Sequence, residues 1–192
     1  MEDIEGAEAR LEFTDSKVVK QRHRKNYRHP DLDRKIREER TEQEARVMRE
    51  ARKNGVTVPR VEKTGSDTLE MDEIDGDQLK DVLEDNLDAV KLLGENAAKL
   101  HQADIIHGDL TTRNAMLSGE ELFLIDFGLA FRSPRTEDKA IDIHLLKQVL
   151  ESSHPQVVES AWEKFLSGYR SYEDSGEVLE RLEEVEQRGR YK

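Results

Sequence analysis

The sequence predicts an α+β protein with two lobes, a small strand-rich lobe at the N-terminus and a mostly helical lobe after it. Short strand-like segments separated by turns lie in the first part of the chain, and apolar residues at helical spacing dominate the second part. The turn Asp75-Gly76-Asp77 lies between the two regions. We expect one domain over the 192 residues, with 1–74 as the N-lobe, 75–187 as the C-lobe and 188–192 as a basic tail.

The expected N-lobe begins with two strands and ends with a third. Strand-like segments at 9–13 and 17–21 come first, and a basic loop at 22–30 follows them. Residues 56–61 contain a proline, which is unfavourable inside a sheet, so we expect a loop there. Residues 68–74 have the composition of a strand and lead into the turn between the lobes.

A charged helix is expected between the second and third of these strands. Ala45, Met48 and Ala51 lie on one helical face, and the pair Asn54-Gly55 is typical of a helix end, so the helix should run to about residue 53. Asp31 or Asp33 can cap its start, directly after a proline. The prediction is a long, charged helix with one apolar face.

The C-lobe is expected to consist of helices interrupted by one hairpin. The segment 105–110 should be extended, and the strands 115–117 and 122–125 flank the turn pair Ser118-Gly119. Helical spacing of apolar residues marks the inner faces of the helices, namely Leu79, Val82 and Leu83; Leu87, Val90, Leu93, Ala97 and Leu100; Ile141, Leu145, Leu146 and Val149; Val158, Ala161, Trp162, Phe165 and Tyr169; and Val178, Leu182 and Val185.

The composition excludes several classes of protein. The chain has no cysteine, which rules out disulfides and thiolate chemistry and fits a cytoplasmic protein. No apolar run reaches the roughly 18 residues that a membrane span needs, so we expect no membrane association. The first residues have neither the basic region nor the apolar core of a secretory signal. Hydrophobic residues make up 35% of the chain, and their periodicity argues against disorder.

The charge is unevenly distributed along the chain. Residues 17–40 contain ten Lys and Arg against four Asp and Glu, a local charge of +6 within a protein of net charge -12. Such a stripe indicates either a solvated, ion-paired helix face or a surface for one anionic partner, such as nucleotide phosphates, RNA or an acidic protein. Composition alone leaves both interpretations open.

One motif carries most of the functional information. The run His107-Gly108-Asp109-Leu110-Thr111-Thr112-Arg113-Asn114 is followed, after the hairpin, by Asp126-Phe127-Gly128. Asp109 can orient an attacking hydroxyl or water, while Asn114 and Asp126 can supply oxygen ligands to Mg²⁺. Each piece alone could cap a turn or close a loop. Together, and in this order, they predict phosphoryl transfer from a nucleotide.

With this motif the chain resembles the protein-kinase superfamily, and most closely the small atypical, RIO-like kinase subunit of the KEOPS complex. The resemblance covers nearly the whole chain and implies a minimal bilobal kinase-like fold. It also implies binding of ATP with Mg²⁺. Further matching segments are Gly6-Ala7-Glu8-Ala9, Tyr27-Arg28-His29-Pro30-Asp31-Leu32-Asp33, Arg40-Thr41, Glu44-Ala45-Arg46 and Arg188-Gly189-Arg190-Tyr191.

The resemblance assigns further roles by position. Lys20 matches the strand lysine that contacts the nucleotide phosphates, and Glu44 matches the helix glutamate that pairs with it, with Glu42 as a neighbouring candidate. Taken alone, Lys20 could be one more solvated lysine of the basic stripe. The motif at 107–114 and 126–128 favours the catalytic role, so Asp109, Lys20 and Glu44 are the predicted catalytic residues.

Other positions are expected to surround the nucleotide. Gly6, Ala7, Glu8 and Ala9 should lie over the phosphates, although a single glycine stands where ordinary kinases have three. Met71, Glu73 and Ile74 should present the backbone of the lobe-connecting strand to the adenine. His107 should brace the catalytic loop rather than transfer protons. Asp142 could brace the same loop or cap the next helix.

Two departures from ordinary kinases narrow the expected function. Gly108 stands where regulated kinases often carry the arginine that reads a phosphorylated activation loop. About a dozen residues separate Gly128 from a helix expected to begin near Ile141, too few for an activation segment with a peptide-docking platform. A protein kinase that reads substrate sequences is therefore not expected.

The resemblance implies a serine/threonine-kinase-type ATPase that supports threonylcarbamoyladenosine formation on tRNA next to the anticodon. Its implied partners are the KEOPS threonylcarbamoyl-transferase subunit, other KEOPS subunits and tRNA, the last through residues 17–40 and the tail 188–192, which could equally be a frayed terminus. The alternatives are a RIO-type ribosome-maturation kinase, a small-molecule phosphotransferase, and a docking module with a structural nucleotide. The short chain argues against the phosphotransferase.

Overall fold

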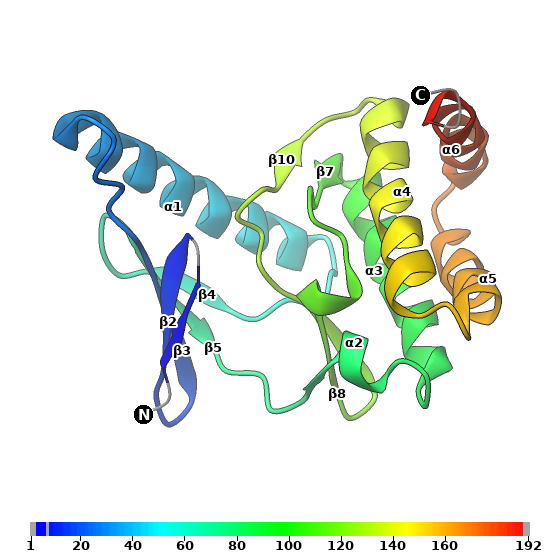
Figure 1. Ribbon diagram of the computed structural model, residues 1–192, viewed down its shortest axis with the longest axis horizontal. Helices are drawn as coiled ribbons and strands as arrows, with labels where there is room; N and C mark the ends of the chain where they lie inside the picture. Colours follow the sequence, from blue (N-terminus) through cyan, green and yellow to red (C-terminus); the bar gives the residue numbers. More distant parts are fainter. Residues whose placement is uncertain (1–2, 7, 190–192) are drawn as a thin grey trace.

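The computed structural model describes residues 3–6 and 8–189 and has a sheet at one end and a bundle of helices at the other (Figure 1). The N-terminal sheet is antiparallel, with the strand order β1-β2-β3-β5-β4. Its strands are β1 (Asp3–Glu5), β2 (Ala9–Phe13), β3 (Lys17–Arg22), β4 (Val61–Lys63) and β5 (Thr68–Asp72). The fold is of the predicted α+β class with a strand-rich first part and a helical second part.

Helix α1 (Pro30–Lys53) crosses from the sheet to the helical part (Figure 1). Pro30 occupies its first turn, where its missing N–H costs nothing, and Gly55 follows the end of the helix with a φ of 79° that glycine adopts without strain. The sequence had indicated a helix cap at Asp31 or Asp33. Because Pro30 starts the helix, the cap position is instead His29. Asp33 is instead buried and accepts hydrogen bonds from the Lys25 backbone and from Arg37.

The helical part contains five helices among the described residues, together with short strands. The helices are α2 (Leu79–Val82), α3 (Leu87–Gln102), α4 (Thr136–Ser153), α5 (Val158–Tyr169) and α6 (Ser175–Gly189), and a 3₁₀ turn η1 spans Thr112–Asn114. The strands β6 (Asp77–Gln78), β8 (Ala115–Ser118) and β9 (Glu121–Leu124) form one small sheet, and β7 (Ile105–Ile106) pairs with β10 (Phe131–Arg132).

Several boundaries differ from those that the sequence indicated. Strand β4 lies partly in the expected loop, because the proline stands just ahead of the strand and removes no ladder hydrogen bond. Strand β1 was not predicted. Helix α4 begins at Thr136 instead of near Ile141, and α6 continues through the first two residues of the expected basic tail. Residues 190–192 of that tail lie outside the described residues.

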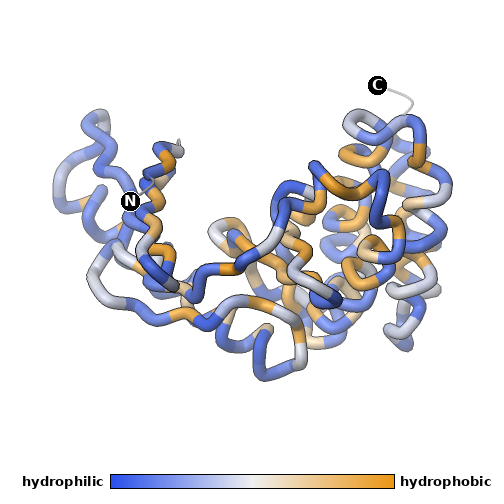
Figure 2. The backbone as a smooth tube through the Cα atoms, turned by 90° about the horizontal axis from the view of Figure 1, so that it is seen from below, coloured by the Kyte–Doolittle hydropathy of each residue, from blue (hydrophilic) through white to orange (hydrophobic). Residues whose placement is uncertain are grey.

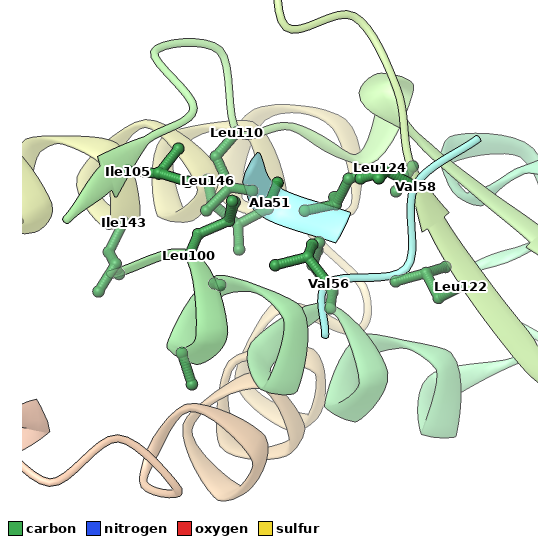
Figure 3. Close-up of a cluster of buried hydrophobic side chains, with 14 of the residues drawn as sticks. Ala51, Val56, Val58, Leu100, Ile105, Leu110, Leu122, Leu124, Ile143 and Leu146 are labelled. Carbon is green, nitrogen blue, oxygen red and sulfur yellow. The ribbon is translucent and has the colours of Figure 1, made fainter. Parts of the chain in front are cut away.

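One hydrophobic core joins the end of α1 to the helical part. Ala51 from α1 and the segment Val56 to Val58 lie among side chains from the hairpin and from α3 and α4, including Leu122, Leu100 and Leu146 (Figure 3). The buried side chain of Asn96 crosses this region. It accepts a hydrogen bond from the Thr57 N–H at 3.0 Å and donates one to the Leu122 carbonyl at 2.8 Å. The segment that leads from α1 to β4 is thus fixed to the helical part.

Hydropathy differs between the two ends of the molecule. Figure 2 shows hydrophobic residues recurring along the helices of the C-terminal half, whereas the composition of the long α1 is strongly hydrophilic. No helix in the described part of the chain combines the length and the apolar composition needed to cross a membrane. Most of the buried hydrophobic residues accordingly belong to the helical half.

Helices α3 and α5 approach each other at two glycines. A Cβ atom at Gly94 would lie 2.2 Å from the carbonyl oxygen of Phe165, and one at Gly168 would lie 2.1 Å from that of Lys91. Both contacts are to backbone, which cannot move aside without shifting a whole helix. The two glycines therefore set the distance between these helices.

We expect Gly168→Ala to destabilise the protein by about 2 kcal/mol or more, because the added methyl must push α3 and α5 apart. Gly176→Ala is the matched control. It also lies in a helix, but a Cβ atom there would meet nothing within 4 Å, so alanine should be neutral or stabilising. Thermal unfolding measures both variants. Equal midpoints for the two would contradict the close-packing interpretation.

Candidate active site

A buried ion-pair network connects the sheet, α1 and the end of the hairpin. The Lys20 ammonium, on β3, lies 2.7 Å from Oε1 of Glu44 on α1 and 2.8 Å from Oδ1 of Asp126. Glu44 is buried, whereas the side chain of Asp126 is 53% exposed. The pair expected between Lys20 and Glu44 is present, and Glu42 instead pairs with Lys63 at the surface. The ammonium is held at one place, next to an open carboxylate.

Arg22 completes the network and was not anticipated from the sequence. Its guanidinium donates to Oε2 of Glu44, so the one carboxylate contacts two cations of the same strand. Lys20 and Arg22 are two residues apart, and residues at this spacing point to the same face of a strand. This two-residue spacing could have indicated that Arg22 lies beside Lys20. It was not noticed because many other Lys and Arg residues surround the pair in the sequence.

Hairpin β8–β9 brings the other motif residues together. Asn114 precedes β8, and its carbonyl accepts a hydrogen bond from the Ile125 N–H at 3.0 Å, which places Asp126 next to it. The Asn114 amide nitrogen donates to Oδ2 of Asp109 at 2.7 Å and to the Asp109 carbonyl at 2.9 Å. Asp109, Asn114 and Asp126, far apart in the sequence, thus lie around one point at the junction of the two parts.

Asp126 has an unusual backbone conformation. Its φ is 58°, in the left-handed region that residues other than glycine seldom adopt. The Gly128 N–H donates to Oδ1 of Asp126 at 3.3 Å, and a Cβ on Gly128 would lie only 3.1 Å from that oxygen. Glycine at 128 therefore lets the turn close under the carboxylate.

The loop that carries Asp109 is braced from behind by Asp142 of α4. Its carboxylate accepts hydrogen bonds from the His107 N–H at 2.8 Å and the Gly108 N–H at 2.9 Å, and it also contacts His101 at 3.3 Å. Of the two interpretations that the sequence left open for Asp142, the brace is observed. His101 in turn contacts the Tyr169 hydroxyl at 2.8 Å, a buried link that the sequence did not suggest.

His107 is a buried structural residue in this loop, as expected. Its Nε2 lies 3.2 Å from the Ile125 carbonyl, and its ring packs against Phe127 with the centroids 4.7 Å apart. Its Nδ1 lies 3.4 Å from the Asp109 backbone nitrogen. The imidazole thus connects the loop to the strand end that carries Asp126.

Gly108 has a steric reason to be glycine. Its φ is 78°, and a Cβ atom would lie 2.5 Å from the carbonyl oxygen of Leu129. Any side chain, arginine included, would collide with the segment that follows Gly128. That segment is shorter than expected, because only residues 129–135 separate Gly128 from α4.

Lys20 and Asp126 perturb each other's pKa. Burial disfavours the charged form of each, but for Lys20 the attraction of Glu44 and then of Asp126 outweighs burial, and for Asp126 the charge and hydrogen bond of Lys20 do so. The pKa of Lys20 is therefore raised and that of Asp126 is lowered. For Asp142, burial is likewise outweighed by the hydrogen bond and charge of His101, so its pKa is lowered. The site therefore presents ionised carboxylates at neutral pH.

The segment 6–9, which was expected to lie over the nucleotide phosphates, connects β1 to β2. The Gly6 N–H donates to the Ala9 carbonyl at 3.0 Å, and Ala9 lies opposite Arg22 in the sheet. Glu8 is exposed and pairs with Lys25 and Arg40. Ala7 lies outside the described residues. The turn is thus attached to the Arg22 end of β3.

The segment expected to receive the adenine follows β5. Met71 lies in that strand opposite Val18, and Glu73 is exposed and leads out of it. The Glu73 N–H donates to the Ser16 carbonyl at 3.0 Å, so this group already has an acceptor. Ile74 is half-buried. Recognition of a base here would rely on the other backbone groups of the segment.

The residues present fit a magnesium ion. Mg²⁺ prefers oxygen ligands and retains several waters, so it needs few protein ligands. Asp126 offers a half-exposed carboxylate, and Asn114 makes its contacts through the amide nitrogen, which leaves the amide oxygen able to bind. Among the described residues, no group of three or more His, Cys, Asp or Glu is placed to hold a metal. The ion would therefore depend on phosphate oxygens for further ligands.

Comparison with known proteins identifies the fold and the family. The structure is similar to that of the RIO2 kinase of Chaetomium thermophilum in its ADP/Mg²⁺-phosphoaspartate complex, with a TM-score of 0.60, 14% identity, and coverage of 100% of this chain and 71% of that one. The fold is therefore that of the protein-kinase-like class. A family model described as the RIO domain matches residues 7–156. The chain belongs to the RIO domain family.

Relatives at higher identity carry more specific names. The chain is 40% identical to the KEOPS complex subunit Bud32 of Pyrococcus abyssi, over 98% of this chain and 94% of the relative. It is 45% identical to a probable bifunctional tRNA threonylcarbamoyladenosine biosynthesis protein of Methanospirillum hungatei, over 97% of this chain but 35% of the relative. The chain thus spans about a third of the bifunctional relative and nearly all of the Bud32 relative.

We expect Lys20→Met to raise the pKa of Asp126, because the substitution removes the cation that lowers it and leaves the burial that raises it. Carboxyl carbon shifts followed by NMR through an acid titration measure this. Lys17→Met is the control, since Lys17 lies on the same strand but pairs with Asp72 and Glu70. An unchanged Asp126 titration in Lys20→Met would show that the contact is not formed in solution.

Proposed function

We propose that this chain is an ATP-dependent, magnesium-requiring atypical kinase or ATPase that works as a KEOPS subunit and supports threonylcarbamoyladenosine formation on tRNA. The arrangement of Lys20 and Glu44 around the open carboxylate of Asp126, with Asp109 and Asn114 beside it, is the observation that carries the chemistry. The names of the relatives carry the biological setting. The proposed location is the cytoplasm.

Each residue has a proposed role in positioning the nucleotide. Lys20, fixed by Glu44, contacts the phosphates as a localised positive charge. Asn114 and Asp126 would hold Mg²⁺, which when bound neutralises phosphate charge. Asp109 orients the attacking hydroxyl or water through the carboxylate that Asn114 holds in place. Catalysis of this kind needs accurate positioning more than covalent chemistry.

The surroundings of the nucleotide are assigned by the same proposal. The backbone of the turn that contains Gly6, Glu8 and Ala9 covers the phosphates, and the segment that contains Met71, Glu73 and Ile74 receives the adenine. The short segment between Gly128 and α4 supports ATP hydrolysis, autophosphorylation or action inside a complex over recognition of substrate peptides. We propose that the threonylcarbamoyl transfer itself belongs to a partner subunit.

Binding of tRNA is proposed to involve residues 17–40 and the C-terminal end. Many basic side chains of the first region are already paired, as in Arg37 with Asp33 and Asp67 and in Arg40 with Glu8. At the other end, Arg188 lies 3.4 Å from Glu137 of α4. Phosphates of tRNA would therefore compete with existing ion pairs, and binding should weaken as salt rises.

Replacement of Asp109 or Asp126 by alanine should lower ATP turnover by at least about 100-fold, because each removes a group that orients or neutralises the reacting atoms. Hydrolysis measured with excess Mg²⁺, alongside thermal unfolding, checks this. Asp15→Ala removes an exposed carboxylate from a turn of the sheet and should leave turnover unchanged. Wild-type rates in both active-site variants would refute the catalytic assignment.

A chain ending at Gln187 tests the docking role of the C-terminal end. We expect it to keep its basal ATP turnover and to lose most of the stimulation by tRNA and by the partner subunit, because it lacks the last basic residues. Arg188→Ala in the full chain separates loss of the Glu137 contact from loss of the final residues. If stimulation and partner binding survive the truncation, the tail has no docking role.

A further inference from the structure

We propose that Arg22 is a positioning residue for the nucleotide chemistry. It holds Glu44 in place while the Lys20 ammonium leaves Asp126 and binds a phosphate. This inference rests on the proposed function, since it concerns the same site. It assigns a defined task to a buried cation that the resemblance to other kinases leaves without a role. The contacts of Glu44 are the first observation in its favour.

Glu44 is shared between two cations by means of its two oxygens. Oε1 contacts Lys20 at 2.7 Å and Oε2 contacts the Arg22 guanidinium, and all three side chains are nine-tenths buried or more. A carboxylate bound on both oxygens cannot rotate freely about its last side-chain bond. The orientation of Glu44, and hence the place it offers to Lys20, depends on the arginine as well as the lysine.

The charges of the network balance only when Arg22 is included. Lys20 and Arg22 carry two positive charges, and Glu44 and Asp126 carry two negative ones. Without Arg22, Lys20 would be the only cation in this network for two carboxylates, and it would be attracted more strongly to both. The lysine would then be less able to leave Asp126 for a phosphate, and Asp126 would be less able to turn to a metal.

The Arg22 guanidinium also lies next to the turn that positions Asp126. A Cβ atom at Gly128 would lie 3.5 Å from a terminal nitrogen of the guanidinium and 3.8 Å from Oε2 of Glu44. The guanidinium therefore fills the space beneath the Asp126-Phe127-Gly128 turn. Its Nε, in contrast, is buried and has no hydrogen-bond partner among the described residues.

The cost of burying this arginine indicates a role other than filling space. A buried guanidinium loses its hydration, and the unpaired Nε recovers none of it. An apolar side chain of similar length would pack on Gly128 without that cost. What it could not do is bind the second oxygen of Glu44 or keep the network neutral, which are the two tasks that we assign to Arg22.

The test combines substitutions of Arg22 and Glu44. We expect Arg22→Met to lower kcat/KM for ATP by about 10- to 100-fold, since misplacement of a phosphate-binding group has effects of this size. Arg22→Lys should recover a substantial part of the loss. In a Glu44→Gln background, Arg22→Met should add less than about twofold, because the group on which it acts is already altered. Arg60→Met, at an exposed arginine of the same lobe outside residues 17–40, serves as the control and should match the wild type.

Calorimetric titration with ADP, with and without Mg²⁺, provides a readout that does not depend on turnover, and thermal unfolding identifies the conditions in which each variant is folded. The proposal requires that Arg22→Met weaken ADP binding at least about threefold in the folded protein and that Glu44→Gln abolish this difference. It is overturned if Arg22→Met equals Arg60→Met, or if its effect adds in full to that of Glu44→Gln. A wild-type protein that binds ADP but never hydrolyses ATP would count against the proposed function, while the binding cycle would still decide the role of Arg22.

Discussion

The carboxylate of Glu44 is the group on which the arrangement of the site depends. It lies on α1, it contacts Lys20 and Arg22 on the sheet, and through Lys20 it is connected to Asp126 at the end of the hairpin. Three segments that are distant in the sequence therefore meet at one buried anion. Burying such a charge is unfavourable unless it is paired, so these segments are held together by the requirement to satisfy it.

A second buried carboxylate organises the other side of the site in a similar manner. Asp142 accepts hydrogen bonds from two consecutive N–H groups of the loop that carries Asp109, and it also contacts His101, whose other ring nitrogen contacts the Tyr169 hydroxyl. The half-buried Asp109 and the exposed Asp126 are thus each supported by a buried anion, Asp142 for the loop of Asp109 and Glu44, through Lys20, for Asp126. Rigid support of this kind is what positioning catalysis requires.

The sequence predicted the parts of the protein whose pattern is local. The long charged helix, the hairpin and the helices of the C-lobe were marked by apolar spacing and by turn residues, and the order of Asp109, Asn114 and Asp126 led to the chemistry proposed for the site. Features that depend on tertiary contact were missed. The pairing of Arg22 with Glu44, the position of Asn96 in the core and the link from Tyr169 to His101 join residues whose neighbours in sequence give no sign of the contact. Strand β1, at the edge of the sheet, likewise has no local signal strong enough to mark it.

The shared core beneath α1 has a consequence for motion. The last turn of α1 is fixed among the side chains of the helical part, while the middle of the same helix is bonded to the sheet through Glu44. A rotation of the sheet relative to the helical part that keeps this last turn in place would pivot near Ala51 and carry Glu44 along with the sheet, and it would break the hydrogen bond from Gln43 to the Ala130 carbonyl. In that geometry α1 acts as a lever arm, and a partner that pushes on its exposed first turns would change the spacing between Lys20 and Asp126 from a distance.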